Sequence, residues 1–340
     1  MTTRTTGPDT PSATYRRRRS SEAFTNLARL NVDGKAGERW IVSPKSSPGT
    51  ATPTASSPFP LGQLCGRRLG CCGVSEGELL TGDGVTQGIV RIGDTVRRPL
   101  RPFSLTVQAY LAHLRDAGFT GAPLPFGVDE QGREMLSFVP GDVPRNPLPP
   151  ETAGDDVLVA LARLIRTLHE ASAGWAPPPG AVWGGTPANV GRITERTELV
   201  SHRDYYPGNV VFRDGLPVAL IDFDLAMPTT RLYDIANALW YWAPLRDPRD
   251  RAPAFAEADI PYRVAVFADA YGMTARHRAE LAPFAVDMAR RYHEDSRASA
   301  ELDPVFRKLW EDGAKDELPR AEAWLREAAP AITARLGQPG

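Results

Sequence analysis

The chain has few cysteines. Cys65, Cys71 and Cys72 are the only three in 340 residues, and they share one short stretch without a nearby histidine. Adjacent cysteines do not have the spacing of zinc ligands, and so small a number does not indicate a disulfide framework. The sequence therefore predicts reduced thiols, which are typical of a cytoplasmic protein.

The chain also lacks an excess of one charge and a long apolar run. Its 40 Lys and Arg residues nearly balance its 41 Asp and Glu residues, which argues against nucleic-acid binding through bulk positive charge. No apolar run approaches the roughly 18 residues of a membrane span, and the N-terminus lacks the apolar segment of a secretory signal. We expect a cytoplasmic protein with neither a nucleic-acid nor a membrane partner.

Lysine is scarce. The four lysines are Lys35, Lys45, Lys308 and Lys315, so no ammonium group is available in the long central region between the second and the third. Any cation that a site in this region needs must come from arginine, whose guanidinium can hold a phosphate through two hydrogen bonds.

Residues 1–60 differ in composition from the rest. Thr, Ser, Pro, Gly and Arg dominate them, and few apolar residues are available for burial. We predict that residues 1–75 form a largely disordered, low-complexity N-terminal extension. The four arginines at 16–19 are interpreted as part of a solvated tail, with an anionic contact or a targeting signal as alternatives.

From residue 78 onward the pattern indicates short strands followed by a helix. Residues 78–100 combine β-branched residues with Gly-rich turns, as is typical of antiparallel strands. Residues 104–117 carry apolar side chains at helical spacing, with Ser104 as the expected N-cap. Residues 123–141 predict a hairpin that turns at 129–132.

Beyond the Pro-rich residues 144–150 the chain is predicted to be mainly helical, at 157–169 and again over 262–336. Between these helices, Asp214-Gly215 separates two apolar runs and predicts a further hairpin. The whole pattern predicts an α+β fold. Residues 76–141 would form a small antiparallel sheet with one helix, and residues 142–340 a mostly helical part.

Polar residues with regular spacing follow residue 199. His-Arg-Asp at 202–204 precedes Asn209 by five residues, and Asp222 ends the apolar run after the hairpin turn. Such an aspartate cannot be buried unpaired without a large cost, so it must face a cleft, a cation or a partner.

These spacings suit phosphoryl transfer, in which positioning and charge neutralisation do most of the catalysis. Asp204 is the candidate base that orients an acceptor hydroxyl and takes its proton. Asn209 and Asp222 offer one neutral and one charged oxygen, the ligand type that Mg²⁺ prefers.

This segment resembles the aminoglycoside phosphotransferase and choline kinase-like group of the protein kinase-like superfamily. His-x-Asp-x-x-x-x-Asn at 202–209, hydrophobic-Asp at 221–222 and Tyr-Asp-Ile-Ala at 233–236 carry the resemblance, which covers about residues 78–336. It implies a bilobal protein kinase-like fold that transfers the γ-phosphate of ATP, with Mg²⁺, to a hydroxyl of a small molecule.

By position, the resemblance implies a role for each motif residue. Asp204 would be the catalytic base, with His202 bracing its loop, and Asn209 and Asp222 would hold Mg²⁺. Asp234 would tie the catalytic loop to a helix. The residues implied to bind the nucleotide are Gly82, Gly84 and Thr86 over the phosphates, Arg97 as the phosphate-binding cation, and Ser137, Phe138 and Val139 in the hinge beside adenine.

Two positions depart from the family pattern. The strand that should carry a phosphate-binding lysine has Arg97 and Arg98 instead. Arg97 aligns better, and Arg98 is the alternative, since neighbouring strand residues point to opposite faces. The helix glutamate that pairs with this cation is absent, because Val107 occupies its place. Another partner is therefore required, or phosphate alone braces the cation.

The resemblance implies an antibiotic such as an aminoglycoside as acceptor, bound by a monomer or weak homodimer. Aminoglycosides are polycations that need an acidic pocket, and the first acidic candidates are Asp287, Glu294 and Asp295. The neighbouring helical segments mix both charges, which weakens this assignment. The alternatives are a kinase for a metabolite such as choline, homoserine or a sugar, and a non-catalytic nucleotide-binding relative.

Deletion of residues 1–60 should leave the melting temperature and the activity nearly unchanged, because their composition provides too few apolar residues for a core. Thermal unfolding and nucleotide-dependent turnover of the full-length and shortened proteins check this. A large loss of either quantity would show that the segment belongs to the fold.

Overall fold

The computed structural model describes residues 78–80, 88–189 and 197–338, which belong to one compact unit of the chain. The predicted extension of residues 1–75 and the predicted phosphate turn with Gly82, Gly84 and Thr86 lie outside the described residues. In the described part of the chain, no helix is both long and apolar enough to cross a bilayer.

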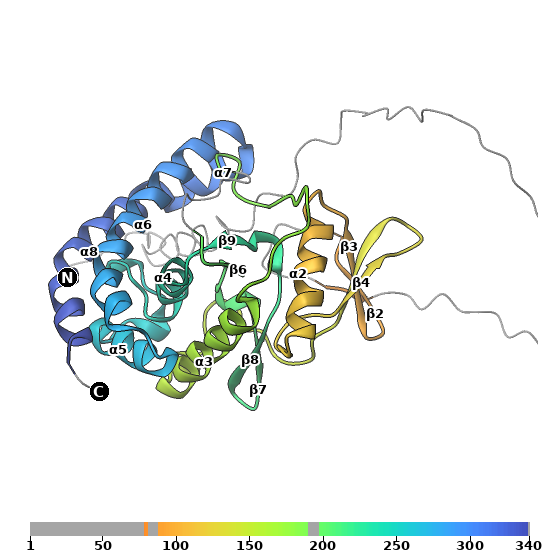
Figure 1. Ribbon diagram of the computed structural model, residues 1–340. Helices are drawn as coiled ribbons and strands as arrows, with labels where there is room; N and C mark the ends of the chain where they lie inside the picture. The colour runs from red at the N-terminus through yellow and green to blue at the C-terminus, as the bar shows by residue number, and fades with distance from the viewer. Residues whose placement is uncertain (1–77, 81–87, 190–196, 339–340) are drawn as a thin grey trace, which may run out of the picture. The chain divides into compact units, whose positions relative to one another are not determined.

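A five-stranded antiparallel sheet forms the first part of the fold (Figure 1), with the strand order β1-β2-β3-β5-β4. Its strands are β1 (Glu78–Leu79), β2 (Val90–Ile92), β3 (Thr95–Pro99), β4 (Pro125–Val128) and β5 (Arg133–Ser137). The register places Arg98 of β3 directly opposite Glu134 of β5. Both side chains are buried, so two opposite charges face each other across neighbouring strands.

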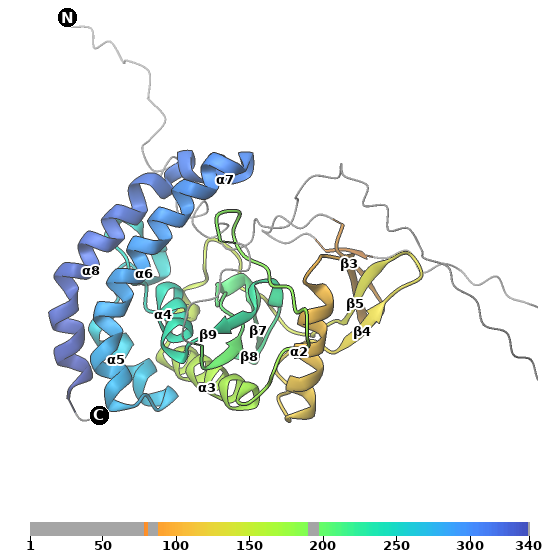
Figure 2. The same ribbon diagram turned by 45° about the horizontal axis from the view of Figure 1, so that its top comes forward.

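Helix α2 (Ser104–Asp116) packs between this sheet and the helical part of the chain, as Figures 1 and 2 both show. Its buried apolar residues are Val107, Tyr110, Leu111 and Leu114, at the predicted helical spacing. The N-cap is Phe103 rather than Ser104, because the Ser104 hydroxyl accepts the Arg101 N–H. The Tyr110 hydroxyl donates to the Val200 carbonyl at 2.8 Å, which joins α2 to the second part of the fold.

The second part is mainly helical, as predicted. Its helices are α3 (Asp155–Ser172), α4 (Arg231–Trp242), α5 (Ile260–Tyr271), α6 (Ala275–Leu302), α7 (Pro304–Leu309) and α8 (Lys315–Leu336). Single turns occur at η1 (Pro150–Ala153), η4 (Pro248–Asp250), η5 (Pro253–Phe255) and η6 (Trp310–Ala314). Helices α6 and α8 pack side by side (Figures 1 and 2), and one apolar core extends from α2 through α3 and α4 to α8.

Four short strands flank the polar motif residues at 202–209 and 221–222. The strand pairs are β6 (Leu199–Ser201) with β9 (Met227–Thr229), and β7 (Val210–Arg213) with β8 (Leu216–Leu220). The predicted hairpin turn is present, because Asp214 and Gly215 have φ angles of 51° and 77°. Strand β8 ends at Leu220, so that Asp222 follows the strand as the N-cap of the single turn η3 (Phe223–Leu225).

Candidate active site

The loop between β6 and β7 holds Asp204 in a fixed position. The residue is only 2% exposed, and its Oδ2 atom accepts a hydrogen bond from Asn209 Nδ2 at 2.8 Å. The same Asn209 amide donates to the Asp204 carbonyl at 3.1 Å. Arg203, just before Asp204, has a φ of 63°, a conformation that residues other than glycine rarely adopt. The loop therefore stores backbone strain where it turns to present the carboxylate.

His202 links this loop to the end of β8. Its Nδ1 atom accepts the Asp204 N–H at 3.2 Å, so its Nε2 atom carries the hydrogen and donates to the Ile221 carbonyl at 2.9 Å. The Ile221 N–H in turn donates to the Asn209 carbonyl at 2.9 Å. Both backbone groups of Ile221 are thus bound to the loop, which places the next residue, Asp222, beside it.

Helix α4 supports the loop through Tyr205. The Tyr205 N–H donates to Asn237 Oδ1 at 3.1 Å, and the Tyr205 carbonyl accepts Trp242 Nε1 at 2.7 Å. The Tyr205 hydroxyl and the His169 Nε2 atom both bond to Asp234 Oδ2, at 2.5 and 2.9 Å. Burial alone would raise the pKa of Asp234, but the hydrogen bond and charge of His169 outweigh it and hold this pKa below its ordinary value.

Arg98 brings one positive charge into a group of three carboxylates. Its Nε atom donates to Glu134 Oε2 at 2.6 Å. Its Nη1 atom lies 3.3 Å from Asp222 Oδ1, and its Nη2 atom lies 2.5 Å from Asp224 Oδ1. One guanidinium from the sheet therefore contacts both carboxylates that follow β8.

Helix α2 fixes the glutamate of this group. Glu134 is fully buried, and its carboxylate accepts hydrogen bonds from Ser104 Oγ and Gln108 Nε2, each at 3.2 Å. Gln108 is itself held by the backbone of Gly127 on β4. The helix thus contributes neutral donors to the cluster, while the charged partner of Arg98 comes from β5.

The cluster has more negative than positive charge. Burial raises the pKa of Asp224 to about 7, because the attraction of Arg98 is opposed by the charges of Asp222 and Glu134. A site with surplus buried negative charge favours a further cation. The Asp222 side chain is 35% exposed, the most accessible of the carboxylates that Arg98 contacts, so it can contact an incoming ion.

The donor set fits a hard divalent cation. Asp222 supplies a carboxylate and Asn209 an amide oxygen, and the Ile221 backbone joins the two residues. The described residues contain no cluster of three or more His, Cys, Asp or Glu side chains ready to enclose a metal ion. Mg²⁺ suits such an incomplete site, because it binds through one or two protein oxygens and completes its coordination with phosphate and water.

Comparisons with known proteins identify relatives of this chain. A model of the phosphotransferase enzyme family matches residues 181–284. The trifolitoxin immunity protein of Rhizobium leguminosarum bv. trifolii is 30% identical over 269 residues, which are 76% of this chain and 97% of that protein. The chain belongs to the phosphotransferase enzyme family.

Two further similarities are narrower. The homoserine kinase of Phenylobacterium zucineum (strain HLK1) is 49% identical over 45 residues, 13% of this chain and 14% of that enzyme. A choline/ethanolamine kinase family protein from Mesorhizobium loti has a similar structure, with a TM-score of 0.52 and 15% identity over 78% of this chain and 94% of that chain. This chain therefore has the bilobal, protein kinase-like α+β fold that the sequence predicted.

The structure brings together Asp204, His202, Asn209 and Asp222, as the family motif requires. The two neighbouring arginines of β3 contact different groups. The Arg97 guanidinium lies 3.4 Å from Asp129, whereas Arg98 extends from the opposite face of the strand to Asp222. Arg98 is therefore the arginine that contacts the carboxylates after β8, whereas Arg97, the first choice from the sequence, contacts a carboxylate outside this group.

The predicted hinge residues lie where β5 leads into the helical part. Ser137 Oγ accepts the Leu124 N–H, and the Phe138 N–H donates to the Asp94 carbonyl, both at 2.8 Å. These bonds fix the strand end that precedes Val139. Their contact with adenine remains a prediction.

Sequence reasoning missed Glu134 as the partner of Arg98. The family pattern places this partner on the helix, but β5 provides it, 36 residues from Arg98. The sequence contains one signal of this partner. Glu134 and Leu136 are two residues apart in β5, so the charged side chain lies on the same buried face of the strand as the leucine. Such a residue requires a buried counter-charge.

Substitution of Asp234→Asn should lower the free energy of unfolding by about 3 kcal/mol at neutral pH, because it removes a buried, multiply bonded carboxylate. The pKa of Asp234 is lowered in the folded state, so this stabilisation is present above the ordinary carboxyl pKa and is lost as pH falls below about 4. Urea unfolding over a pH series measures it.

The matched control is the exposed Asp287→Asn, expected to change stability by less than about 0.5 kcal/mol. An equal effect of the two substitutions at neutral pH would contradict the supporting role of Asp234.

Proposed function

We propose that this protein transfers the γ-phosphate of ATP, with Mg²⁺, to a hydroxyl group of a small molecule in the cytoplasm. The observation that supports this most strongly is the meeting of Asp204, Asn209 and Asp222 on one hydrogen-bonded loop and strand end, with Arg98 in contact. Carboxylate, amide and guanidinium groups together suit an anionic group that must be positioned and neutralised.

In this proposal Asp204 orients the acceptor hydroxyl and accepts its proton. A bond forms between the hydroxyl oxygen and the γ-phosphorus, the bond from that phosphorus to the bridging oxygen breaks, and ADP leaves with the bond electrons. Asn209 keeps the Asp204 carboxylate in place through its 2.8 Å hydrogen bond. Mg²⁺, when held by Asn209 and Asp222, would supply neutralisation of the phosphate charge.

Arg98 is the proposed phosphate-binding cation. Its guanidinium is held by Glu134 while it contacts Asp222, so it reaches the same place as the metal ligands. The further nucleotide contacts are proposed as the sequence predicts them, from Gly82, Gly84 and Thr86 to phosphate and from Ser137, Phe138 and Val139 to adenine. The Arg98–Glu134 pair fills the role of the missing cation–glutamate pair, which argues against a non-catalytic relative.

For the acceptor we propose an antibiotic-type natural product, with a metabolite as the second candidate. The name of the trifolitoxin immunity protein favours the first, and the local similarity to homoserine kinase the second. The acidic residues considered for an aminoglycoside have other partners. Asp287 and Glu294 pair with Arg290, and Asp295 accepts a hydrogen bond from Asn189. These pairs weaken the aminoglycoside assignment.

Substitution of Asp204→Asn should lower kcat by about 100-fold or more, because the variant keeps the shape of the side chain but cannot accept the hydroxyl proton. A coupled ADP-release assay over antibiotics and metabolites measures turnover, and ATP binding to the variant serves as the control. Turnover like that of the wild type would remove Asp204 from the role of base.

Substitution of Arg98→Ala should raise the KM for ATP by about tenfold or more, because it removes a charge-assisted contact to phosphate. The neighbouring Arg97→Ala is the matched control and should change KM by less than about twofold. Arg98→Lys, which keeps the charge, should recover part of the loss. The opposite ranking of the two alanine variants would show that Arg97 binds the nucleotide.

A further inference from the structure

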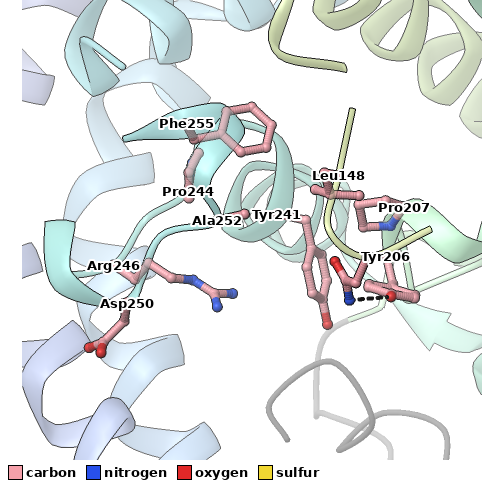
Figure 3. A pocket seen from close by; sticks show the side chains of 10 residues that line it. Leu148, Tyr206, Pro207, Tyr241, Pro244, Arg246, Asp250, Ala252 and Phe255 are labelled. Atoms are coloured by element: carbon pink, nitrogen blue, oxygen red, sulfur yellow. Dashed lines mark hydrogen bonds between the residues drawn. The ribbon is translucent and has the colours of Figure 1, made fainter. Parts of the chain in front are cut away.

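A pocket opens beside the catalytic loop (Figure 3). It holds about 410 Å³ of space, part of which is open to solvent. The residues that line it are Asn146, Leu148, Tyr206, Pro207, Tyr241, Pro244, Arg246, Asp250, Ala252 and Phe255.

The pocket shares the loop that carries Asp204. Tyr206 and Pro207 lie between Asp204 and Asn209 in the chain, and both line the pocket. Asn146 Nδ2 donates to the Tyr206 hydroxyl at 3.2 Å, which joins the residues after the hinge to this wall. A compound bound here therefore lies against the same segment that presents the proposed base.

The walls are largely aromatic and apolar. The rings of Tyr206 and Tyr241 meet edge to face, with centroids 5.8 Å apart. Leu148, Phe255 and three other apolar residues complete the lining. Such side chains can pack against a planar or aliphatic body.

The charge of the lining does not suit a polycation. Of the ten lining residues, Asp250 is the acid, and Arg320 binds its two oxygens at 2.7 and 2.9 Å. Figure 3 shows the Arg246 guanidinium extending toward Tyr241, whereas Asp250 points away from it. The positive charge therefore faces the pocket.

Arg246 is only 9% exposed and lies 5.1 Å from the centre of the Trp240 ring. Burial lowers its pKa, and the nearby charges of Glu317 and Asp250 offset this only in part. An anionic group in the pocket would form a charge-assisted contact with this guanidinium.

We propose that this pocket binds the acceptor, and that the acceptor is an aromatic or aliphatic hydroxyl compound with a carboxylate that contacts Arg246, not a polycation. This rests on the proposed phosphotransfer only in its assignment of the bound compound as acceptor. The charge selectivity of the pocket stands on its lining residues.

Three compounds that share a phenyl ring on a three-carbon chain but differ in charge test the selectivity: phenylpropanoate, phenylpropanol and phenylpropylammonium. Saturation-transfer NMR should show that the carboxylate binds about tenfold or more tightly than the ammonium compound. Arg246→Met should abolish this preference, and Arg246→Lys should retain it in a folded protein. Arg249→Met, at a nearby side chain that is 65% exposed, is the matched control and should change nothing.

Adding Mn²⁺ with a non-hydrolysable ATP analogue tests the acceptor role, because a paramagnetic ion near the pocket will speed relaxation of the bound carboxylate probe. Water-proton relaxation reports separately whether the Mn²⁺–nucleotide complex binds. The site is refuted if no probe binds, if the ammonium compound binds as tightly as the carboxylate, or if Arg246→Met leaves the preference unchanged.

Nucleotide binding without enhanced relaxation of the probe refutes the acceptor role alone. Absence of nucleotide binding refutes the proposed phosphotransfer and the acceptor role together, while charge selectivity that depends on Arg246 would still confirm the carboxylate site.

Discussion

The Arg98 guanidinium is the point at which the sheet meets the carboxylates that follow β8. It contacts Glu134 within the sheet and reaches Asp222 and Asp224 beyond β8. Holding one cation among three carboxylates, two of which are buried, is costly unless each group is paired or a further cation arrives. The raised pKa of Asp224, about 7, reflects this surplus of negative charge. The fold therefore creates a local need for positive charge that a metal ion can meet.

The loop that presents Asp204 has a strained backbone that hydrogen bonds hold in place. Arg203 and Asp222 have φ angles of 63° and 64°, conformations that cost energy in residues with a Cβ atom. The His202 ring donates to the Ile221 carbonyl and the Ile221 N–H donates to the Asn209 carbonyl, and these bonds hold the loop against that strain. Helix α4 holds Tyr205 from the other side. Preorganisation of this kind suits a reaction that depends on positioning.

Much of the fold could be predicted because its signals are local. The hairpin turn at Asp214-Gly215, the apolar spacing of α2 and the His-Arg-Asp motif all depend on residues near one another in the chain. The choice between Arg97 and Arg98 could not be made this way. It depends on the register of β3 with β5, two strands that α2 and β4 separate in the chain.

Other features depend on tertiary placement. Glu134 could be noticed as a charge on the buried face of a strand, but its partner is defined only when the sheet forms. The pocket in Figure 3 likewise joins two separate segments, with Tyr206 from the loop after β6 and Tyr241 and Arg246 from the end of α4 and the turn that follows it. Spacing in the sequence identifies candidate functional residues, but long-range packing decides which of their side chains come into contact.

In the proposed site, Asp222 and Asn209 hold a metal ion that helps to bind ATP beside Arg98. Calorimetric titration of ATP in the presence of Mg²⁺ tests it most directly, with the wild type compared with Asp222→Asn. The account predicts one bound ATP per chain and an affinity lower by about tenfold or more in the variant, or in the wild type after chelation of the metal. Equal affinity in all three samples, or no binding to the wild type, would contradict it.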